Sequence, residues 1–277
     1  MNAHRLSWGL AILTILLPAF AVGQTAKSAA QPVKSLPRVP RAADGKPDLT
    51  GVYQGGSTKP GTWEEANQGI GVAAPEDRAI VGPAPRQDDT PSYQPWAAKL
   101  LTDNYNRRNI EGSSAYCLPN IAMMTVSLFP VQFVQTPQQI VILEEYMSVF
   151  RIIPLNAKHP DDLEPTYVGN SVGHWEGDTL VVDTVSFKEM LHAEGGGGRS
   201  HSDALHLTER FTRTDYNTIS YDAVWDDAKM LTRPFHSRSS FMLRPGTRLQ
   251  EYRCEENNLE PARYEELKKD DSLFKRK

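Results

Sequence analysis

Several features that mark common protein classes are missing from this sequence. No run of Lys and Arg is long enough to follow a nucleic-acid backbone, and the net charge is -4 at pH 7. We therefore expect no nucleic-acid partner. The glycine-rich stretches GGSTKPG and EGGGGRS lack the lysine–serine ending and the following helix of a phosphate-binding loop. A G-x-S-x-G motif is also absent, so the sequence does not indicate a serine hydrolase of that class.

Cysteine is scarce, because the chain contains only Cys117 and Cys254. In an oxidising compartment a lone pair is most simply one disulfide, and we predict this bond. By the chain-entropy model, closing so long a loop stabilises a fold by roughly 3–5 kcal/mol. The alternative is a catalytic thiol, which is disfavoured because an exported free thiol is exposed to oxidation.

The chain has one long apolar run, WGLAILTILLPAFAV, at its N-terminus. Arg5 precedes the run, and small residues stand at Ala19 and Gly23, which is the order found in a secretory signal peptide. Pro18 interrupts the run, which is shorter than the ~20 residues of a membrane-spanning helix. No cysteine follows for lipid attachment. We predict a cleaved signal peptide over residues 1–23, and hence a periplasmic or secreted protein with no membrane span after cleavage.

The rest of the chain is long enough to bury a sizeable core, since 39% of all residues are hydrophobic. Residues 24–46 are rich in Ala, Pro, Lys and Ser and predict a disordered leader. Residues 47–258 predict a single domain, which includes an irregular N-terminal wrap over 55–95. A helix over 95–112 is bounded by a proline and a glycine. The charged tail over 259–277 is expected to form a short helix that frays.

From Phe129 onward the hydrophobic pattern has a period of two. VQFVQTPQQIVILEEYMSVFRIIPL predicts two strands with a turn at Thr136–Pro137, and YVGNSVGHWEGDTLVVDTVSF predicts a hairpin around Glu176–Gly177. Four further segments continue the pattern, with the turn sequences TDYN and RPGT between them: ALHLTERFTR, TISYDAVWDD, RSSFMLRPG and TRLQEYRCEENN. Such a series of short antiparallel strands predicts a barrel or a sandwich. We favour the barrel, because closing the sheet removes exposed edges.

Two sets of residues resemble known sequences. LTGVY, in which Gly51 precedes Tyr53 by two residues, resembles the Gly-x-Trp start of lipocalin-like (calycin-type) barrels, with Tyr in place of Trp. PTYVGNSVGHWEGDTLVVDTVSF, HSDALHLTERF and LQEYRCEENN resemble a widespread family of exported bacterial proteins of unassigned function, over residues 47–258. The resemblance implies a secreted, all-β, mainly antiparallel, lipocalin-like barrel. It transfers no catalytic residues.

Alternation assigns charged side chains to the apolar faces of several strands. In IVILEEYMSVFRII one face carries Glu145 and Arg151, and the other carries Glu144. Asp183 and Glu209 lie on apolar faces of later strands. An acid on such a face is costly to desolvate unless it is paired or hydrogen-bonded. We expect Glu145, Asp183 and Glu209 to line one interior pocket, with Arg151 available to one of them. A bulge or a register shift would turn some of them outward.

The segment HAEGGGGRSHSDALHLTERF places histidines and acids around four glycines, and we expect a loop at one end of the barrel. In one interpretation, Asp203 orients His201 or His206 so that the imidazole transfers protons near neutral pH. In a second, His201, Asp203 and His206 bind zinc or iron, with His192 or Glu194 as further ligands, although the spacing matches no strong ligand motif. In a third, the segment is a solvated polar loop.

Five residues are candidate ligand contacts: Arg151, His174, Trp175, Tyr146 and Tyr221. By alternation with Val172, His174 would face the barrel interior, although a structural role is equally compatible with the pattern. Trp and Tyr side chains of this kind belong more often to a core than to a ligand platform.

These observations predict an exported enzyme without an organic cofactor that acts on a small apolar or aromatic molecule. His201 or His206 with Asp203, and an interior acid such as Glu145, Asp183 or Glu209, would drive isomerisation, elimination, hydration or hydrolysis. The alternative is a non-catalytic periplasmic or secreted lipocalin-like protein that binds a small ligand. A third possibility is an envelope-associated interaction protein with an exposed apolar patch. The sequence leaves the substrate and the oligomeric state open.

Overall fold

The computed structural model describes residues 38–55, 90–106, 112–121, 129–192, 200–256 and 258–269. The signal peptide predicted over 1–23 lies outside these residues, as do most of the leader and most of the irregular wrap. Among the helices in the described ranges, none is long and apolar enough to cross a membrane.

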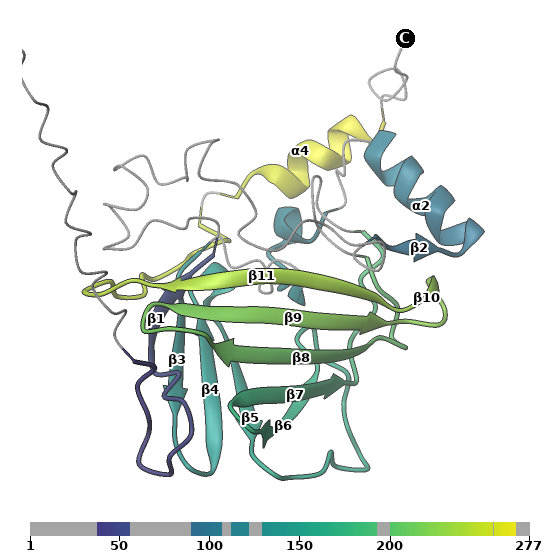
Figure 1. The fold of residues 1–277 in the computed structure, drawn as a ribbon. Coiled ribbons are helices and arrows are strands. Elements are labelled where there is room, and N and C mark those ends of the chain that lie inside the picture. The colour runs from purple at the N-terminus through teal and green to yellow at the C-terminus, as the bar shows by residue number, and fades with distance from the viewer. Residues whose placement is uncertain are drawn as a thin grey trace, which may run out of the picture. The chain divides into compact units, whose positions relative to one another are not determined.

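Nine antiparallel strands form one sheet that curls into a nearly closed barrel (Figure 1). The pattern of period two folds this way because hairpins join antiparallel neighbours through short turns. The prediction of an all-β, mainly antiparallel barrel is confirmed. In sheet order the strands are β5 (Val149–Pro154), β4 (Gln139–Glu144), β3 (Val131–Gln135), β1 (Gly51–Gln54), β11 (Phe235–Leu243), β9 (Thr218–Asp226), β8 (His206–Arg213), β7 (Thr179–Val185) and β6 (Asn170–Glu176).

The barrel closes at a seam between the two end strands, β5 and β6. A parallel bridge joins Leu155 to Gly173, and the Asn156 N–H donates to the Gly173 carbonyl at 2.7 Å. A Cβ at Gly173 would lie 2.9 Å from Cγ2 of Ile153, so the strands approach this closely only because residue 173 has no side chain.

Two of the predicted turns are confirmed, and an unpredicted one changes the assignment of faces. Thr136–Pro137 turns between β3 and β4, and Gly177 adopts a φ of 60° between β6 and β7. The segment after Gln139, predicted as one strand, is broken by a short 3-10 helix, η3 (Tyr146–Ser148). Because β4 and β5 pair Glu144 with Val149 across four intervening residues, the inward positions change from even to odd numbers.

Within the described residues, the helix predicted over 95–112 corresponds to α2, which spans Pro95–Asn106; residues 107–111 lie outside the described ranges. The charged tail contains the helix α4 (Glu260–Leu267), as expected. The remaining elements are a 3-10 helix, η2 (Ser113–Tyr116), and a two-stranded sheet of β2 (Ser92–Tyr93) and β10 (Leu231–Arg233).

TRLQEYRCEENN was wrongly predicted to be a strand. β11, which precedes it, already has β1 and β9 as neighbours, so the turn after β11 leads to no free edge of its own sheet. The segment instead packs Tyr252 against Phe129 and Tyr146. It is also tied down by the predicted disulfide, which is confirmed: the Cys117 and Cys254 sulfurs are 2.11 Å apart.

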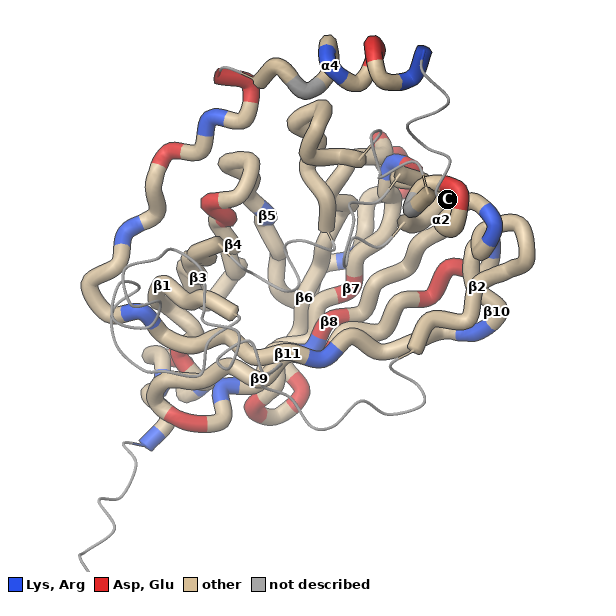
Figure 2. Tube along the Cα trace, turned by 90° about the horizontal axis from the view of Figure 1, so that it is seen from above, with Lys and Arg blue, Asp and Glu red and all other residues tan. Residues whose placement is uncertain are grey.

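Aromatic side chains fill much of the barrel interior. The ring of Phe133 meets those of Tyr53, Phe211 and Phe241 edge-on, with centroids 5.5 to 6.3 Å apart. Burying a ring of this size contributes about 1.5–3 kcal/mol to stability. Seen from above in Figure 2, β3, β4 and β5 stand on one side of this interior, and β8, β9 and β11 on the other. Polar side chains from both sides can therefore meet inside it.

Candidate functional site

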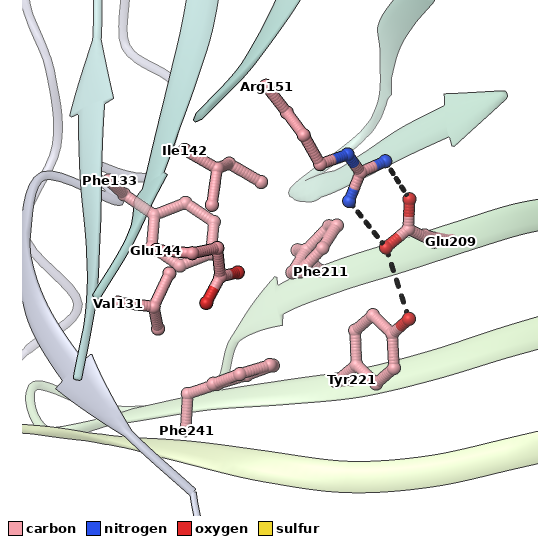
Figure 3. Close-up of a pocket in the computed structure, with 9 residues that line it drawn as sticks. All are labelled: Val131, Phe133, Ile142, Glu144, Arg151, Glu209, Phe211, Tyr221 and Phe241. Atoms are coloured by element: carbon pink, nitrogen blue, oxygen red, sulfur yellow. Dashed lines mark hydrogen bonds and ion pairs between the residues drawn. The ribbon is translucent and has the colours of Figure 1, made fainter. Parts of the chain in front are cut away.

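An interior cavity is lined by three ionisable side chains among apolar and aromatic ones (Figure 3). Its volume is about 10 Å³, enough for about one water molecule. The lining residues come from both sides of the barrel: Val131, Phe133, Ile142, Glu144, Arg151, Glu209, Phe211, Tyr221 and Phe241.

Glu209 of β8 forms a bidentate ion pair with Arg151 of β5. Arg151 Nη1 donates to Oε1 at 3.1 Å, and Nη2 donates to Oε2. The two side chains are 4% and 1% exposed, so the pair is fully shielded from water. The Tyr221 hydroxyl adds a third hydrogen bond, to Oε1 at 3.1 Å. Glu209 is thereby held as a carboxylate in a fixed orientation.

Arg151 also connects the two sides of the seam. Its Nη2 donates to Ser171 Oγ of β6 and to Thr184 Oγ1 of β7, each at 3.1 Å. Burial lowers the pKa of Arg151, but the charge and the hydrogen bonds of Glu209 raise it above its ordinary value overall. Arg151 is therefore a permanent cation that joins β5 to β6, β7 and β8.

Glu144, the last residue of β4, points its carboxyl group into the cavity. The side chain belongs to a residue only 6% exposed, and no described residue forms a hydrogen bond with it (Figure 3). Burial raises the pKa of Glu144 to about 8, with the Arg151 charge opposing this effect and the Glu209 charge adding to it. At pH 7 the carboxyl is therefore mostly protonated and carries a hydrogen-bond donor.

The cavity thus contains two carboxyl groups in different protonation states. Glu144 is a neutral acid, whereas Glu209 is an anion fixed by Arg151 and Tyr221. Acid–base sites commonly hold two carboxyl groups in different environments, as this cavity does. A group of this make-up can donate a proton or a hydrogen bond to a bound molecule in surroundings that exclude water.

The expectation that Glu145, Asp183 and Glu209 share the interior is wrong for two of the three. Glu209 lies inside, but Glu145 starts the turn after β4, where its Oε2 accepts from the backbone N–H of Gln250 at 2.7 Å. The adjacent Glu144 takes the interior position, since it follows Ile140 and Ile142 at steps of two. Alternation along one unbroken strand put Glu144 on the face opposite Arg151, because the turn at η3 was not predicted.

Asp183 lies on the outer face of β7, because Thr184 takes the inward position beside it. Its Oδ1 is 2.5 Å from Nε2 of His206, and its Oδ2 is 2.9 Å from Nε2 of His159. Nδ1 of His159 is 2.7 Å from Oδ1 of Asn170. Partial burial raises the pKa of Asp183, but the hydrogen bonds to His206 and His159 lower it more. We call Asp183, His159, His206 and Asn170 the outer cluster.

Asp203 does not orient either histidine, so the predicted His–Asp pair is wrong. Its carboxylate pairs with Lys229 at 2.6 Å, and both side chains are more than half exposed. His201 is buried at 2% exposure with Nδ1 3.0 Å from the Ser202 carbonyl, and its ring packs 5.4 Å from that of Phe187. Burial lowers the pKa of His201, which keeps the imidazole neutral.

The predicted metal ligands are not assembled in the part of the chain that the structure describes. Nδ1 of His192 is 3.2 Å from Oδ1 of Asn104, and Glu194 lies outside the described residues together with the four glycines. Among those described, no three His, Cys, Asp or Glu side chains are placed to hold a metal ion.

The four remaining candidate ligand contacts lie in four different environments. Tyr221 lines the cavity, whereas Tyr146 belongs to the aromatic cluster with Tyr252. His174 is exposed and pairs with Glu176 at 3.2 Å, so its predicted inward orientation is wrong. Ser171 and Gly173 are buried and take the inward positions of β6, so the alternation places His174 on the outer face. Trp175 is half-buried, with Lys46 Nζ 6.0 Å from its ring centroid.

Comparisons of this chain with models of protein families, with curated proteins and with solved structures gave no match.

Proposed function

We propose that this protein is an enzyme that performs acid–base chemistry inside its barrel, with Glu144 as the group that transfers the proton. One observation carries this proposal: Glu144 is a buried acid without a hydrogen-bond partner, and it faces a cavity. A titratable group that is perturbed by burial and faces a cavity is a candidate for a functional role.

The second acid of the cavity has a supporting role in this proposal. Glu209 is held in one orientation by its hydrogen bonds with Arg151 and Tyr221. Its negative charge helps to keep Glu144 protonated, as does the apolar lining. The assembly suits a reaction in which an oxygen atom of the substrate gains negative charge and takes the Glu144 proton, as in the enolisation step of an isomerisation or elimination. The proton that leaves the substrate carbon passes to solvent water, and solvent reprotonates Glu144.

The size of the cavity favours chemistry over carriage. Sites for drug-sized ligands enclose about 300–1,000 Å³. The cavity here has a volume of only about 10 Å³, enough for about one water molecule, so it is far smaller than such sites. A carrier of a large apolar ligand would not need a neutral acid opposite a fixed ion pair, whereas proton transfer to a small group would.

We also propose that the protein acts outside the cytoplasm, in the periplasm or after secretion. The N-terminal residues support this because they have the order of a signal peptide. The Cys117–Cys254 disulfide supports it independently, because such bonds form and persist in oxidising compartments.

Deuterium incorporation tests the proposed chemistry without knowledge of the natural substrate. A panel of small ketones, aldehydes and α,β-unsaturated carbonyl compounds is incubated with the protein in D₂O, and loss of the α-proton signals is followed by NMR. We expect at least one compound to exchange faster with wild-type protein than in buffer. Glu144→Gln should abolish the acceleration, because an amide does not transfer a proton at this pH.

The matched control is Glu145→Gln, which changes the neighbouring acid outside the cavity and should retain the exchange. Acceleration that survives in Glu144→Gln but disappears in His206→Ala would contradict the proposal. It would move the reaction to the outer cluster.

A further inference from the structure

We propose that the cavity takes an uncharged molecule that presents an oxygen atom as a hydrogen-bond acceptor to Glu144. This inference rests on the proposed function and specifies its substrate class. Amides, ketones, aldehydes and esters have the required chemistry.

The inference follows first from the donors that the cavity leaves unused. The Glu144 carboxyl has no partner among the described residues, and Arg151, which also lines the cavity, has a buried Nε–H without one. Both oxygens of Glu209 already accept hydrogen bonds, so the unused acceptor beside these two donors is the second oxygen of the Glu144 carboxyl itself. A ligand that supplies lone pairs therefore satisfies the unused donors, whereas one that supplies only donors does not.

The charges of the cavity exclude ions as its preferred ligands. The charge of Arg151 is neutralised by Glu209, and its Nη2 makes two further hydrogen bonds to Ser171 and Thr184. An anion in the cavity would therefore not meet an unpaired positive charge at Arg151. With Glu144 protonated, the three ionisable groups sum to zero. An ion would lose its hydration without gaining an opposite charge, which is unfavourable in an interior site. A cation would first have to displace the Glu144 proton.

The lining limits the rest of the molecule. The ring of Phe133 meets those of Phe211 and Phe241 edge-on, and these three apolar rings line the cavity together with Val131 and Ile142. The part of the ligand beyond its oxygen atom is therefore small and apolar, because it must lie against these rings.

Three nearly isosteric probes separate the possible charges: formamide, the formamidinium ion and formate. Each is added to full-length protein carrying ¹³C-labelled Glu carboxyl groups, and the Glu144 signal is assigned from its absence in Glu144→Gln. We expect formamide to shift this signal and the two ions not to. Between about pH 6 and about pH 9 the apparent affinity for formamide should fall about tenfold, as the protonated fraction of Glu144 declines.

Two variants of Glu144 and one control variant test the role of this carboxyl in binding. Glu144→Gln retains a donor, so formamide should still bind and its pH dependence should vanish, as read from the ¹³C signal of added labelled formamide. Glu144→Leu should bind at least tenfold more weakly, and Glu145→Gln should match wild type. Retained binding in Glu144→Leu would overturn the inference.

The outcomes also distinguish this inference from the proposed function. If formamidinium binds, and binds more tightly as the pH rises, the substrate class is wrong and the ligand is a cation. Preferential binding of formate would likewise overturn the class. Either result leaves proton transfer by Glu144 possible. If instead the Glu144 signal titrates near its ordinary value of 4.5, the proposed function itself is wrong.

Discussion

Two acids on neighbouring strands, Glu209 and Asp183, have opposite surroundings. Glu209 on β8 is opposite Val182 on β7, so Asp183 is only one position along the ladder, yet it faces outward. Glu209 is fully buried and paired with a permanent cation, whereas Asp183 is 34% exposed and is bonded to two histidines. One step in register therefore separates an ion pair that is shielded from water from a partly exposed carboxylate with two histidine partners.

The comparison also shows which cluster is complete. Both oxygens of Asp183 are bonded, and each histidine of the outer cluster has a partner, so this cluster is satisfied by its own members. The interior contains Glu144, which has no partner among the described residues. A satisfied surface cluster is explained by structure alone. The unpaired buried acid is not, and this is why we place the reaction inside the barrel.

The largest expected effect comes from breaking the interior ion pair. Arg151→Met leaves the Glu209 charge buried with only Tyr221 as a partner, and we expect a loss of about 3–5 kcal/mol in the free energy of unfolding. Urea denaturation followed by tryptophan fluorescence measures it. The double variant Arg151→Met/Glu209→Leu removes both charges and should be more stable than the single variant. A double variant that is as unstable as the single one would show that seam packing, not charge, sets the cost.

The second prediction concerns the pH dependence of stability. The pKa of Glu144 is higher in the folded protein, at about 8, than its ordinary 4.5, so the folded state binds the proton more tightly. The stabilisation is complete below pH 4.5 and is lost as the pH rises through the folded value. Between these limits the free energy of unfolding should fall by on the order of 1 kcal/mol per pH unit because of this group.

Glu144→Gln should remove this slope, and Glu145→Gln should leave it unchanged. Urea denaturation of both variants and wild type at a series of pH values between 5 and 8 makes the measurement. Parallel curves for Glu144→Gln and wild type would mean that Glu144 is already ionised in the folded protein.

The sequence predicted the barrel because its signals are local: alternating apolar residues, and turns such as Thr136–Pro137 and Glu176–Gly177. The inward face was predictable where a strand continued unbroken, as for Glu209. The prediction of the inward face failed after Glu144. There the residues YMS resemble the flanking strand in composition but form η3, in which Met147 has a φ of 58°. No residue there favours a positive φ, so the pairing of β4 with β5 imposes the turn.

Partners of charged side chains were the least predictable feature. Asp203 precedes His206 by three residues, which suggested a local pair, but each bonds to a residue from another part of the chain. Lys229 and Asp183 are 26 and 23 residues away from them, respectively. Sheet register decides such contacts, and register is a property of the whole barrel.

The third prediction tests the outer cluster. Asp183→Asn removes the charge that both histidines face, and we expect a loss of about 1 kcal/mol at neutral pH, because the group is partly exposed to solvent. The pKa of Asp183 is lowered from 3.8 by the fold, so its stabilisation is present above that value and disappears as the pH falls through the folded value. The difference between variant and wild type should therefore shrink below pH 3.8. Acid denaturation monitored by circular dichroism tests this, and a difference that grew with acidity would contradict it.

The smallest effect is expected for His206→Ala, and it completes the contrast between the two clusters. The His206 side chain is 49% exposed, so its pair with Asp183 is screened and should contribute at most about 0.5–1 kcal/mol. His159 still bonds the other oxygen of Asp183 in this variant, so the carboxylate is not left alone. Deuterium exchange should be unchanged, because no described contact links His206 to the cavity. A double-mutant cycle with Asp183→Asn measures the coupling between the two side chains. A coupling of several kcal/mol, or a loss of exchange, would mean that the outer cluster acts on the interior and that the two sites are not separate.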